Sequence, residues 1–426
     1  MSRDSVVTVT IDRVGAEGDG IATAPDGTTL YIPYTLPGET VRVGPEMAVL
    51  RASDSRVAAP CAHFGECGGC VVQHWNDPGY RGWKTALLQT ALRRAGFMDV
   101  PIAPLQVTPP KSRRRMDLAV RRTPRGVRVG LHRRATQAGA RASSPDVCDL
   151  TECHVLHPAL FALVEPLRPL LAKLHAMRRE GSIVANLLDD GVDLLLRTDA
   201  ALDRADRQHL IDFARTHRLP RVSHAPMKGE AEPIIIMQPP RIALSGTSIE
   251  PAPGAFLQAS REGEAAIVQA VLAGLPPKLP PRARIAELYA GSGSLTFALA
   301  QHARVVAWEG DACAVTALRQ ASNRAGLAGR ITVTQRDLAR QPLLAAELAG
   351  FAAVVLDPPF AGAAEQMAQI ASVKVARVVY VSCNPAVLAR DARILREAGY
   401  GLVGATPIDQ FLWSARLESV CVFSHA

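Results

Sequence analysis

The stretch Arg284-Ile-Ala-Glu-Leu-Tyr289, followed by Ala290-Gly-Ser-Gly-Ser-Leu295, decides the predicted fold of this chain. Its first half is a short run typical of a buried strand, and its second half is a glycine-rich loop that leads into a helix. In an open α/β sheet, this order of elements suits a nucleotide-type ligand. Thr296 stands where a third glycine would complete a dinucleotide motif, and the loop lacks the Gly-Lys of a P-loop, so the pattern favours neither of those ligands.

Four more strand-like runs follow this loop, at residues 304–308, 331–334, 352–356 and 377–381, and they alternate with helical patterns. This alternation predicts a Rossmann-like α/β domain with a doubly wound, mostly parallel sheet. We assign it to residues 248–426.

The ends of these strands carry acidic residues. Ligands bind such sheets outside the carboxyl ends of the strands, and Glu309, Asp337 and Asp357 stand there. Glu309 is placed to accept hydrogen bonds from ribose hydroxyls, and Asp337 from an adenine amine. S-adenosylmethionine offers both groups and no pyrophosphate, so it fits this series and the loop glycines Gly291 and Gly293. Each acid taken singly is equally well explained as a helix cap or a surface charge.

The last strand of the series ends at Ser382-Cys383-Asn384-Pro385. A thiol held at a strand end can act as a nucleophile, and Pro385 can open the next helix at its first turn. The alternative for a single cysteine is a small buried hydrophobe. We favour the nucleophile because Asp357, the Gly-rich loop and Glu418 near the C-terminus complete a possible site.

The whole chain has 426 residues, enough for two to four domains. It contains no apolar run near the roughly 20 residues that span a bilayer and no secretory signal pattern, so we expect a cytoplasmic protein without membrane contact. In that compartment its eight cysteines are more typical of metal binding or catalysis than of disulfides. No obligate protein partner is indicated.

The first 58 residues alternate short β-type runs with Gly and Pro turns, which predicts a small β-barrel. The segments Gly18-Asp-Gly-Ile-Ala22, Ile32-Pro33 and Leu36-Pro-Gly-Glu39 resemble a TRAM domain, an RNA-binding barrel. The alternative is a barrel used only for protein contacts.

A cysteine-rich loop follows, Pro60-Cys61-Ala-His-Phe-Gly-Glu-Cys67-Gly-Gly-Cys70. It places three thiolates within reach of one centre, and its glycines let the backbone wrap closely around a metal. A fourth ligand is needed, and Cys148 and Cys153 are the candidates. Zinc and a [4Fe–4S] cluster both remain possible on these residues.

Positive charge is concentrated in one segment of the predicted central α/β domain, residues 59–247. The chain carries a net charge of +8, and Lys111–Arg141 alone holds eleven Lys and Arg residues and one acid, so this segment accounts for +10. Two strand-like runs, 116–120 and 127–131, predict a hairpin that carries these arginines. Such a stripe favours contact with a nucleic acid, against the alternative of a solvated Arg-rich face.

Taken together, these motifs resemble the RNA (uracil-5-)methyltransferase family, in its iron–sulfur-containing bacterial class that modifies 23S rRNA. The resemblance covers nearly the full length and rests on the barrel, the cysteine loop and five short motifs: Phe256-Leu-Gln258, Glu287-Leu-Tyr-Ala-Gly-Ser-Gly293, Asp357-Pro-Pro, Ser382-Cys-Asn-Pro385 and Leu417-Glu418-Ser419.

The resemblance implies a methyltransferase that acts through a covalent cysteine–uracil intermediate. Cys383 would add to carbon 6 of uracil, Glu418 would remove the proton from carbon 5, and Asp357 would position the base or cofactor. S-adenosylmethionine would be lined by the family-type positions Gln258, Tyr289, Glu309 and Asp357. A [4Fe–4S] cluster would be held by Cys61, Cys67, Cys70 and Cys153.

Some positions depart from the family pattern. Ser294 stands where asparagine is frequent, Asp337 replaces another polar residue, and Phe360 follows Asp-Pro-Pro where arginine is usual. Two alternatives remain beside the 23S rRNA enzyme. One is a tRNA-directed relative, which usually lacks the barrel and the cluster. The other is a non-catalytic RNA-binding iron–sulfur protein, which would not need both Cys383 and Glu418.

Overall fold

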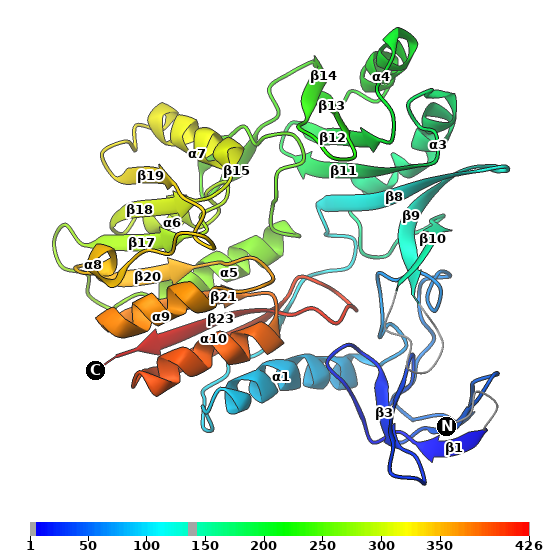
Figure 1. Cartoon of the computed structure of the whole chain (residues 1–426), viewed down its shortest axis with the longest axis horizontal. Coiled ribbons are helices and arrows are strands. Elements are labelled where there is room, and N and C mark those ends of the chain that lie inside the picture. The colour runs from blue at the N-terminus through cyan, green and yellow to red at the C-terminus, as the bar shows by residue number, and fades with distance from the viewer. Residues whose placement is uncertain (1–5, 135–142, 426) are drawn as a thin grey trace.

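The structure of the chain is a computed structural model that describes residues 6–134 and 143–425. The chain forms three bodies, each built on β-sheet (Figure 1). The N-terminal strands lie at one end of the molecule and the central sheet lies beside them. The large sheet of the predicted catalytic domain, named the catalytic sheet below, occupies the other side.

The N-terminal body consists of two three-stranded antiparallel sheets, in the orders β1-β5-β6 and β2-β3-β4. Its strands are β1 (Val7–Thr10), β2 (Arg13–Val14), β3 (Gly20–Thr23), β4 (Thr29–Ile32), β5 (Thr40–Val43) and β6 (Ala48–Arg51). Alternate side chains from these strands meet in one small apolar core that contains Ile11, Ile32 and Val41.

The central body is a seven-stranded sheet in the order β10-β9-β8-β11-β12-β13-β14. Its elements are β8 (Arg115–Thr123), β9 (Gly126–Arg134), β10 (Ser143–Asp149), α2 (Pro158–Phe161), α3 (Val164–Lys173), β11 (Glu180–Leu188), β12 (Gly191–Thr198), α4 (Arg204–Thr216), β13 (Arg221–Pro226) and β14 (Glu232–Ile236). β8 and β9 pair antiparallel, so the predicted hairpin is confirmed. Only the β12–β13 pair is parallel, because α4 forms the crossover between them. A short hairpin, β15 (Ile242–Leu244) and β16 (Thr247–Ile249), leads to the catalytic body.

The catalytic sheet has eight strands in the order β19-β18-β17-β20-β21-β23-β22-β7. Its strands are β7 (Gln106–Val107), β17 (Arg284–Leu288), β18 (Arg304–Glu309), β19 (Ile331–Gln335), β20 (Ala353–Leu356), β21 (Arg377–Ser382), β22 (Gly401–Asp409) and β23 (Glu418–Ser424). The five predicted strands are β17 to β21, all parallel, and β23 runs antiparallel between β21 and β22. The predicted Rossmann-like fold is therefore confirmed.

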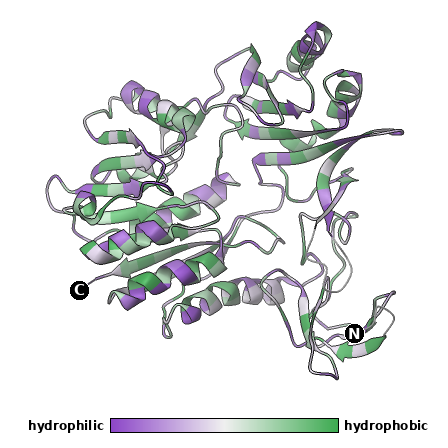
Figure 2. Cartoon of the chain, in the orientation of Figure 1, coloured by the Kyte–Doolittle hydropathy of each residue, from purple (hydrophilic) through white to green (hydrophobic). Residues whose placement is uncertain are grey.

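Helices cover both faces of this sheet. They are α5 (Arg261–Gly274), α6 (Thr296–Leu299), α7 (Ala312–Arg324), α8 (Ala345–Leu348), α9 (Ala364–Val373) and α10 (Pro385–Glu397). Successive strand residues point to opposite faces, so Val379 joins a core with α5 and α7 while Tyr380 joins one with α9 and α10. The strands are accordingly largely hydrophobic in Figure 2, as expected when both faces are buried.

The helix α1 (Asp77–Arg94) packs on the catalytic sheet, and the strand β7 is part of it. Both lie within residues 59–247, which were assigned to the central domain from the sequence. The side chains of Leu88 and Leu92 enter the core that α10 shares, and β7 pairs with the edge of β22. The catalytic body is thus completed by a segment that precedes the central sheet in the chain. Among the described residues, no helix is both long enough and apolar enough to cross a membrane.

Candidate active site

The Gly-rich loop after β17 is shaped by backbone angles that favour glycine. The φ angles of Gly291 and Gly293 are 55° and 100°, and Tyr289 also has a positive φ of 63°. A Cβ atom added at Gly293 would lie 2.7 Å from Leu318 Cδ1, so close packing excludes a side chain there. At Gly291 an added Cβ meets nothing within 4 Å, which leaves this side of the loop accessible to a ligand.

Glu309 lies against this loop. It is the last residue of β18, and its Oε2 accepts a hydrogen bond from the Gly291 N–H at 2.8 Å. Asp337 follows the next strand, as predicted, but its carboxylate is exposed and turned to its own loop, where Oδ1 accepts the N–H of Arg340 at 3.2 Å. The structure therefore brings Glu309 to the loop, whereas Asp337 has the contacts of a turn cap.

Cys383 lies at the turn between β21 and α10. Asn384 caps the helix by accepting the N–H of Ala386 at 3.2 Å, and Pro385 occupies the first helical position. The thiol is half-buried. Burial, together with the negative charges of Glu418 and Asp357, raises the pKa of Cys383 to about 12, and the positive charge of Arg416 acts in the opposite direction. The resting thiol is therefore protonated, and its proton must leave when the sulfur forms a bond.

The register of two antiparallel strands brings Glu418 to this cysteine. β21 and β23 pair so that Ser382 faces Ser419. In an antiparallel pair, the residue after Ser382 and the residue before Ser419 lie at the same end of the two strands. Cys383 and Glu418 therefore share one edge of the sheet although they are far apart in the sequence.

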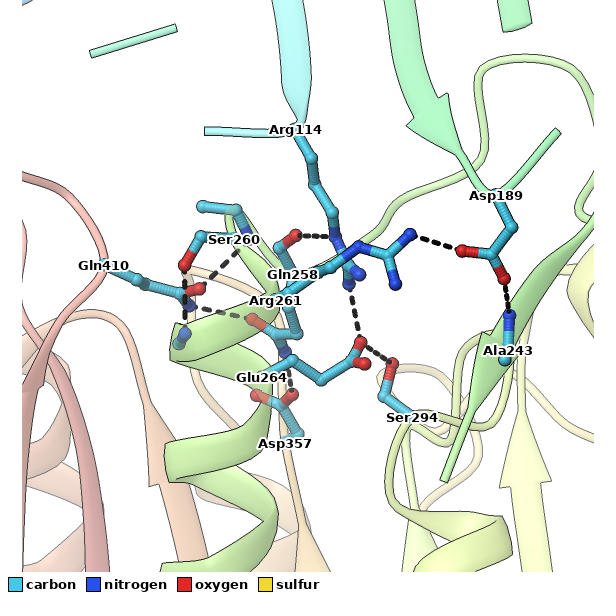
Figure 3. A network of polar contacts seen from close by, with 12 residues as sticks. Arg114, Asp189, Ala243, Gln258, Ser260, Arg261, Glu264, Ser294, Asp357 and Gln410 are labelled. Carbon is cyan, nitrogen blue, oxygen red and sulfur yellow. Dashed lines mark hydrogen bonds and ion pairs between the residues drawn. The ribbon is translucent and has the colours of Figure 1, made fainter. Parts of the chain in front are cut away.

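Two glutamine side chains connect Glu418 to Asp357. Gln410 Nε2 donates to Glu418 Oε2 and to Gln258 Oε1, at 2.8 Å each. Gln258 Nε2 in turn donates to Asp357 Oδ2 at 3.1 Å. Figure 3 shows Gln410, Gln258 and Asp357 in this chain. Gln258 was a predicted site residue. Gln410 was not, because its only sequence signal is its place eight residues before Glu418.

The two carboxyl groups at the ends of this chain have raised pKa values. Burial is the main cause for both, and the charge of Asp357 adds to the effect on Glu418. The hydrogen bonds from Gln258 and Gln410 act in the opposite direction, because they favour the ionised forms. Glu418 Oε1 is buried and accepts no hydrogen bond within the described part of the chain. This oxygen is therefore available to take a proton.

A third buried carboxyl group, Glu287, was not among the predicted site residues. It lies in β17 with 1% of its surface exposed, and burial raises its pKa to about 8, with further contributions from the charges of Asp357 and Glu309. Its Oε2 also lacks a hydrogen-bond partner among residues 6–134 and 143–425. An acid inside an otherwise apolar strand was the signal in the sequence.

Ser294 is tied to the central body through Glu264 and Arg114. Ser294 Oγ donates to Glu264 Oε2 at 3.4 Å, and Arg114 Nη2 lies 2.7 Å from the same oxygen. Arg114 Nε also donates to the backbone carbonyl of Gln258 at 3.0 Å (Figure 3). Only 3% of the Arg114 side chain is exposed. Arg114 immediately precedes β8, so its contacts join the central body to the catalytic body. The prediction that Arg114 lies in a basic surface stripe is wrong.

Most other arginines of the stripe also have partners within the protein. Arg121 pairs with Glu180, Arg133 with Glu66 and Arg134 with Asp19, while Arg122 donates to backbone carbonyls near the end of α3. Arg125 and Arg128 are exposed on the hairpin. Arg141 lies outside the described residues. The stripe is thus a set of structural ion pairs as well as a charged surface.

The cysteine-rich loop lies against β9. Cys61, Cys67, Cys70 and Cys153 are all partly buried, and burial raises the pKa of Cys67 to about 11 and that of Cys70 to about 12. The charges of Cys61 and Cys153 add to both shifts, and that of Cys67 adds to the shift of Cys70, as expected for neighbouring thiols.

Backbone N–H groups point at two of these sulfurs. Gly69 N lies 3.5 Å from Cys67 Sγ, and Leu156 N lies 3.4 Å from Cys153 Sγ. Gly68 is required because an added Cβ would lie 2.6 Å from a backbone oxygen of β9. Cys148 is instead buried in β10, 3.7 Å from His63 Nδ1. The loop and the 153–156 turn therefore enclose four of the five candidate thiols.

Comparison with known proteins gives two domain matches and full-length relatives. Residues 3–44 match the TRAM domain, and residues 267–388 match a family described as conserved hypothetical protein 95. A protein of Brucella suis biovar 1, named as an uncharacterized RNA methyltransferase, is 39% identical over 422 residues, which cover 98% of this chain and 97% of that protein. The 23S rRNA (uracil(1939)-C(5))-methyltransferase RlmD of Pectobacterium carotovorum subsp. carotovorum is 33% identical, covering 98% of this chain and 94% of that protein.

A solved structure has the same fold. The Pyrococcus abyssi tRNA (uracil-54, C5)-methyltransferase, described in complex with S-adenosyl-L-homocysteine, aligns with a TM-score of 0.70 at 18% identity and covers 97% of this chain and 99% of its own. At that identity the likeness concerns the fold. The two full-length sequence relatives are 39% and 33% identical to this chain, and their alignments extend over nearly the whole of it. The chain therefore belongs to the RNA methyltransferase family.

Proposed function

We propose that this protein methylates carbon 5 of a uridine in RNA, with S-adenosylmethionine as methyl donor. The observation that carries the proposal is the β21–β23 register, which sets a thiol, Cys383, and a buried carboxyl, Glu418, at one edge of the sheet. The chemistry requires this pair, because carbon 5 of uracil is a poor nucleophile until a thiolate has added to carbon 6.

The reaction then proceeds in three steps at these residues. Cys383 loses its proton to water and its sulfur bonds to carbon 6, which makes carbon 5 an enolate-like nucleophile. Carbon 5 then takes the methyl group of S-adenosylmethionine, and S-adenosylhomocysteine is the leaving group. Glu418 removes the proton that remains on carbon 5. The electron pair of that C–H bond re-forms the 5,6 double bond and expels the sulfur of Cys383. The raised pKa of Glu418 suits it to hold a proton near neutrality.

The methyl donor is proposed to bind along the Gly-rich loop. Gly291 and Gly293 shape the loop, and Tyr289 and Ser294 flank them. Glu309 already accepts an N–H of this loop and is placed to accept ribose hydroxyls. The Asp357 N–H donates to the carbonyl of Leu288, which precedes this loop, and the Asp357 side chain is linked through Gln258 and Gln410 to Glu418. Asp337 would reach an adenine amine only by leaving its turn contacts.

We further propose that Cys61, Cys67, Cys70 and Cys153 hold a [4Fe–4S] cluster. The N–H groups of Gly69 and Leu156 point at Cys67 Sγ and Cys153 Sγ, and hydrogen bonds to the sulfurs are a feature of iron–sulfur sites. A zinc ion held by the same four thiolates is the alternative.

The RNA substrate is proposed to be 23S rRNA. The TRAM match and the RlmD relative support this choice, while the fold relative that acts on tRNA keeps tRNA as the alternative. The test is mass spectrometry of 5-methyluridine in purified 23S rRNA and tRNA from a strain that lacks the gene. Loss of one 5-methyluridine from 23S rRNA is expected. Loss from tRNA would support the alternative, and no loss from either would contradict the proposed function.

A further inference from the structure

An exposed aromatic ring and an exposed guanidinium lie in contact beside the nucleophile. Phe360 follows Asp357-Pro-Pro and has 48% of its surface exposed. The guanidinium carbon of Arg416 lies 4.2 Å from the centre of the Phe360 ring. Arg416 stands two residues before Glu418, so the two side chains come from the two loops that carry the candidate carboxylates.

The pair borders the catalytic cysteine. Asn384, the residue after Cys383, donates its side-chain amide to the backbone carbonyl of Phe360 at 3.2 Å. The positive charge of Arg416 acts on the Cys383 thiol, as its effect on that pKa indicates. A uridine whose carbon 6 touches Cys383 would therefore have Phe360 and Arg416 as close neighbours.

Hydrogen bonds from other side chains hold the backbone segments that carry Phe360 and Arg416. Lys84 Nζ is buried and donates to the carbonyl of Arg416 and to that of Phe411. Arg390 Nη2 donates to the carbonyl of Ala361, next to Phe360, at 2.9 Å. The platform formed by the Phe360 ring and the Arg416 guanidinium is thus presented on fixed loops and needs little ordering when a ligand binds.

The contact itself contributes little to folding, since a cation–π pair at an exposed site is worth about 0.5–1 kcal/mol. An aromatic ring beside a guanidinium is instead suited to stacking on a nucleic-acid base. Proteins that read unpaired RNA stack bases on aromatic rings and on guanidinium planes, and bases splayed out of a loop are the usual targets. A target uridine that enters a buried site must itself leave its stack, so the adjacent base loses a stacking partner.

We propose that Phe360 and Arg416 form a stacking platform for an unpaired nucleotide adjacent to the methylated uridine. The base of that nucleotide stacks on the platform, and its presence holds the target uridine over Cys383. This subsite rests on the proposed function, because it needs an RNA whose uridine enters the site. It makes the enzyme select uridines in single-stranded segments.

The test uses the shortest rRNA fragment that the wild-type protein methylates, with each nucleotide beside the target replaced in turn by an abasic one. Phe360→Ala should raise the Kd for the intact fragment about 5- to 150-fold, since a stacked base is worth about 1–3 kcal/mol. Phe360→Tyr should bind normally, and Arg416→Ala should weaken binding. The Kd for S-adenosylmethionine should be unchanged in all three variants. Leu344→Ala and Arg324→Ala, which remove an exposed apolar and an exposed basic side chain from the same body, are the matched controls.

The abasic fragments give the decisive comparison. One of them should weaken binding by the wild-type protein as much as Phe360→Ala does, with no additional loss when the two changes are combined. Normal binding by Phe360→Ala, or fully additive losses, would overturn the platform while leaving the methyltransferase proposal intact. If the wild-type protein methylated no fragment, the proposed function would itself fail, and the subsite with it.

Discussion

The amide group of Gln410 donates to Glu418 Oε2 at 2.8 Å, and this hydrogen bond favours the ionised form of the proposed general base. Gln410 Nε2 also reaches Gln258, which reaches Asp357. The two carboxyl groups are therefore joined by amides that cannot themselves titrate. Such a connection fixes the position of each carboxyl group and lets each oppose the ionisation of the other.

Replacing Gln410 with Met should shift the pH dependence of methylation. Loss of the donated hydrogen bond raises the pKa of Glu418 further, so the acid limb of the kcat profile should move to higher pH. We expect a loss of about tenfold at pH 7, the size of one hydrogen bond to a charged group, with recovery as pH rises. Gln301→Met, which changes an exposed glutamine, is the control. An unshifted profile would mean that Gln410 only fills space.

The proposed roles of Cys383 and Glu418 predict different fates for two variants. Cys383→Ala should bind RNA and S-adenosylmethionine but give neither adduct nor product. Glu418→Gln should still add the thiol and transfer the methyl group, because both steps precede removal of the proton. It should then accumulate a methylated protein–RNA adduct that survives denaturing electrophoresis, since loss of a general base costs about 10²–10⁴-fold in rate. Normal turnover by Glu418→Gln, or an adduct in Cys383→Ala, would show that the roles are misassigned.

Glu287 should make the protein less stable as pH rises. Its pKa is about 8 in the folded protein and 4.5 in the unfolded chain. Between these values the unfolded state has lost the proton that the folded state keeps, so the free energy of unfolding falls with rising pH, by up to about 5 kcal/mol. Glu287→Gln should remove this part of the dependence and be relatively more stable at pH 9 than at pH 5. Denaturant unfolding at both values measures it, with Glu397→Gln at the exposed end of α10 as control. An identical pH dependence in wild type and Glu287→Gln contradicts the assignment.

The cysteine assignment predicts a brown protein. Anaerobic purification should yield about four irons per chain and visible absorption, both lost in Cys153→Ala. Cys148→Ala is the matched control, because Cys148 is buried in β10 and its sulfur lies 3.7 Å from His63 Nδ1, so it tests the other candidate for the fourth ligand. It should retain the iron. Stoichiometric zinc without colour would exclude the cluster. Loss of iron only in Cys148→Ala would show that Cys148, and not Cys153, is the fourth ligand.

Lys84 and Asp409 should contribute strongly to stability as a pair. Both side chains are fully buried, with 2.8 Å between the charged atoms. Lys84→Met would leave a buried carboxylate without its partner, at a cost of about 3–5 kcal/mol. Arg81→Met on the same helix breaks the exposed pair with Asp77 and should cost less than about 1 kcal/mol. Equal midpoints of unfolding for the two variants would contradict the expectation.

The sequence predicted the positions that depend on local pattern. A strand followed by a turn can be recognised within about ten residues, so the sequence alone places Glu309, Asp357 and Cys383 at strand ends. The hairpin of β8 and β9 and the presence of five parallel strands follow from the same short-range signals, whereas the order of those strands in the sheet was not predicted. The strand β22 was not predicted, because it contains Gly404 and Pro407, which interrupt a strand pattern, and β23 was not predicted either.

The remaining site residues act through contacts that no local pattern encodes. Gln410 meets Gln258 across 152 positions, and Arg114 meets Glu264 across 150. Arg114 also shows why counting charges can mislead. The same run of arginines can lie on a solvated face or be buried in an interface, and the sequence does not distinguish the two. Whether each arginine is exposed or buried depends on the acids and backbone carbonyls that the fold brings to its guanidinium.

The docking of α1 on α10 has a consequence for the order of events during synthesis. Arg94 and Gly96 contact residues of α10 that are made 299 and 300 positions later. At roughly 5–20 residues per second, the apolar face of α1 waits about 15–60 s for its partner on the ribosome. The barrel and the central sheet have finished translation by then. The nucleophile and its base therefore come together last, and a chain released early would expose a helix face that chaperones and proteases recognise.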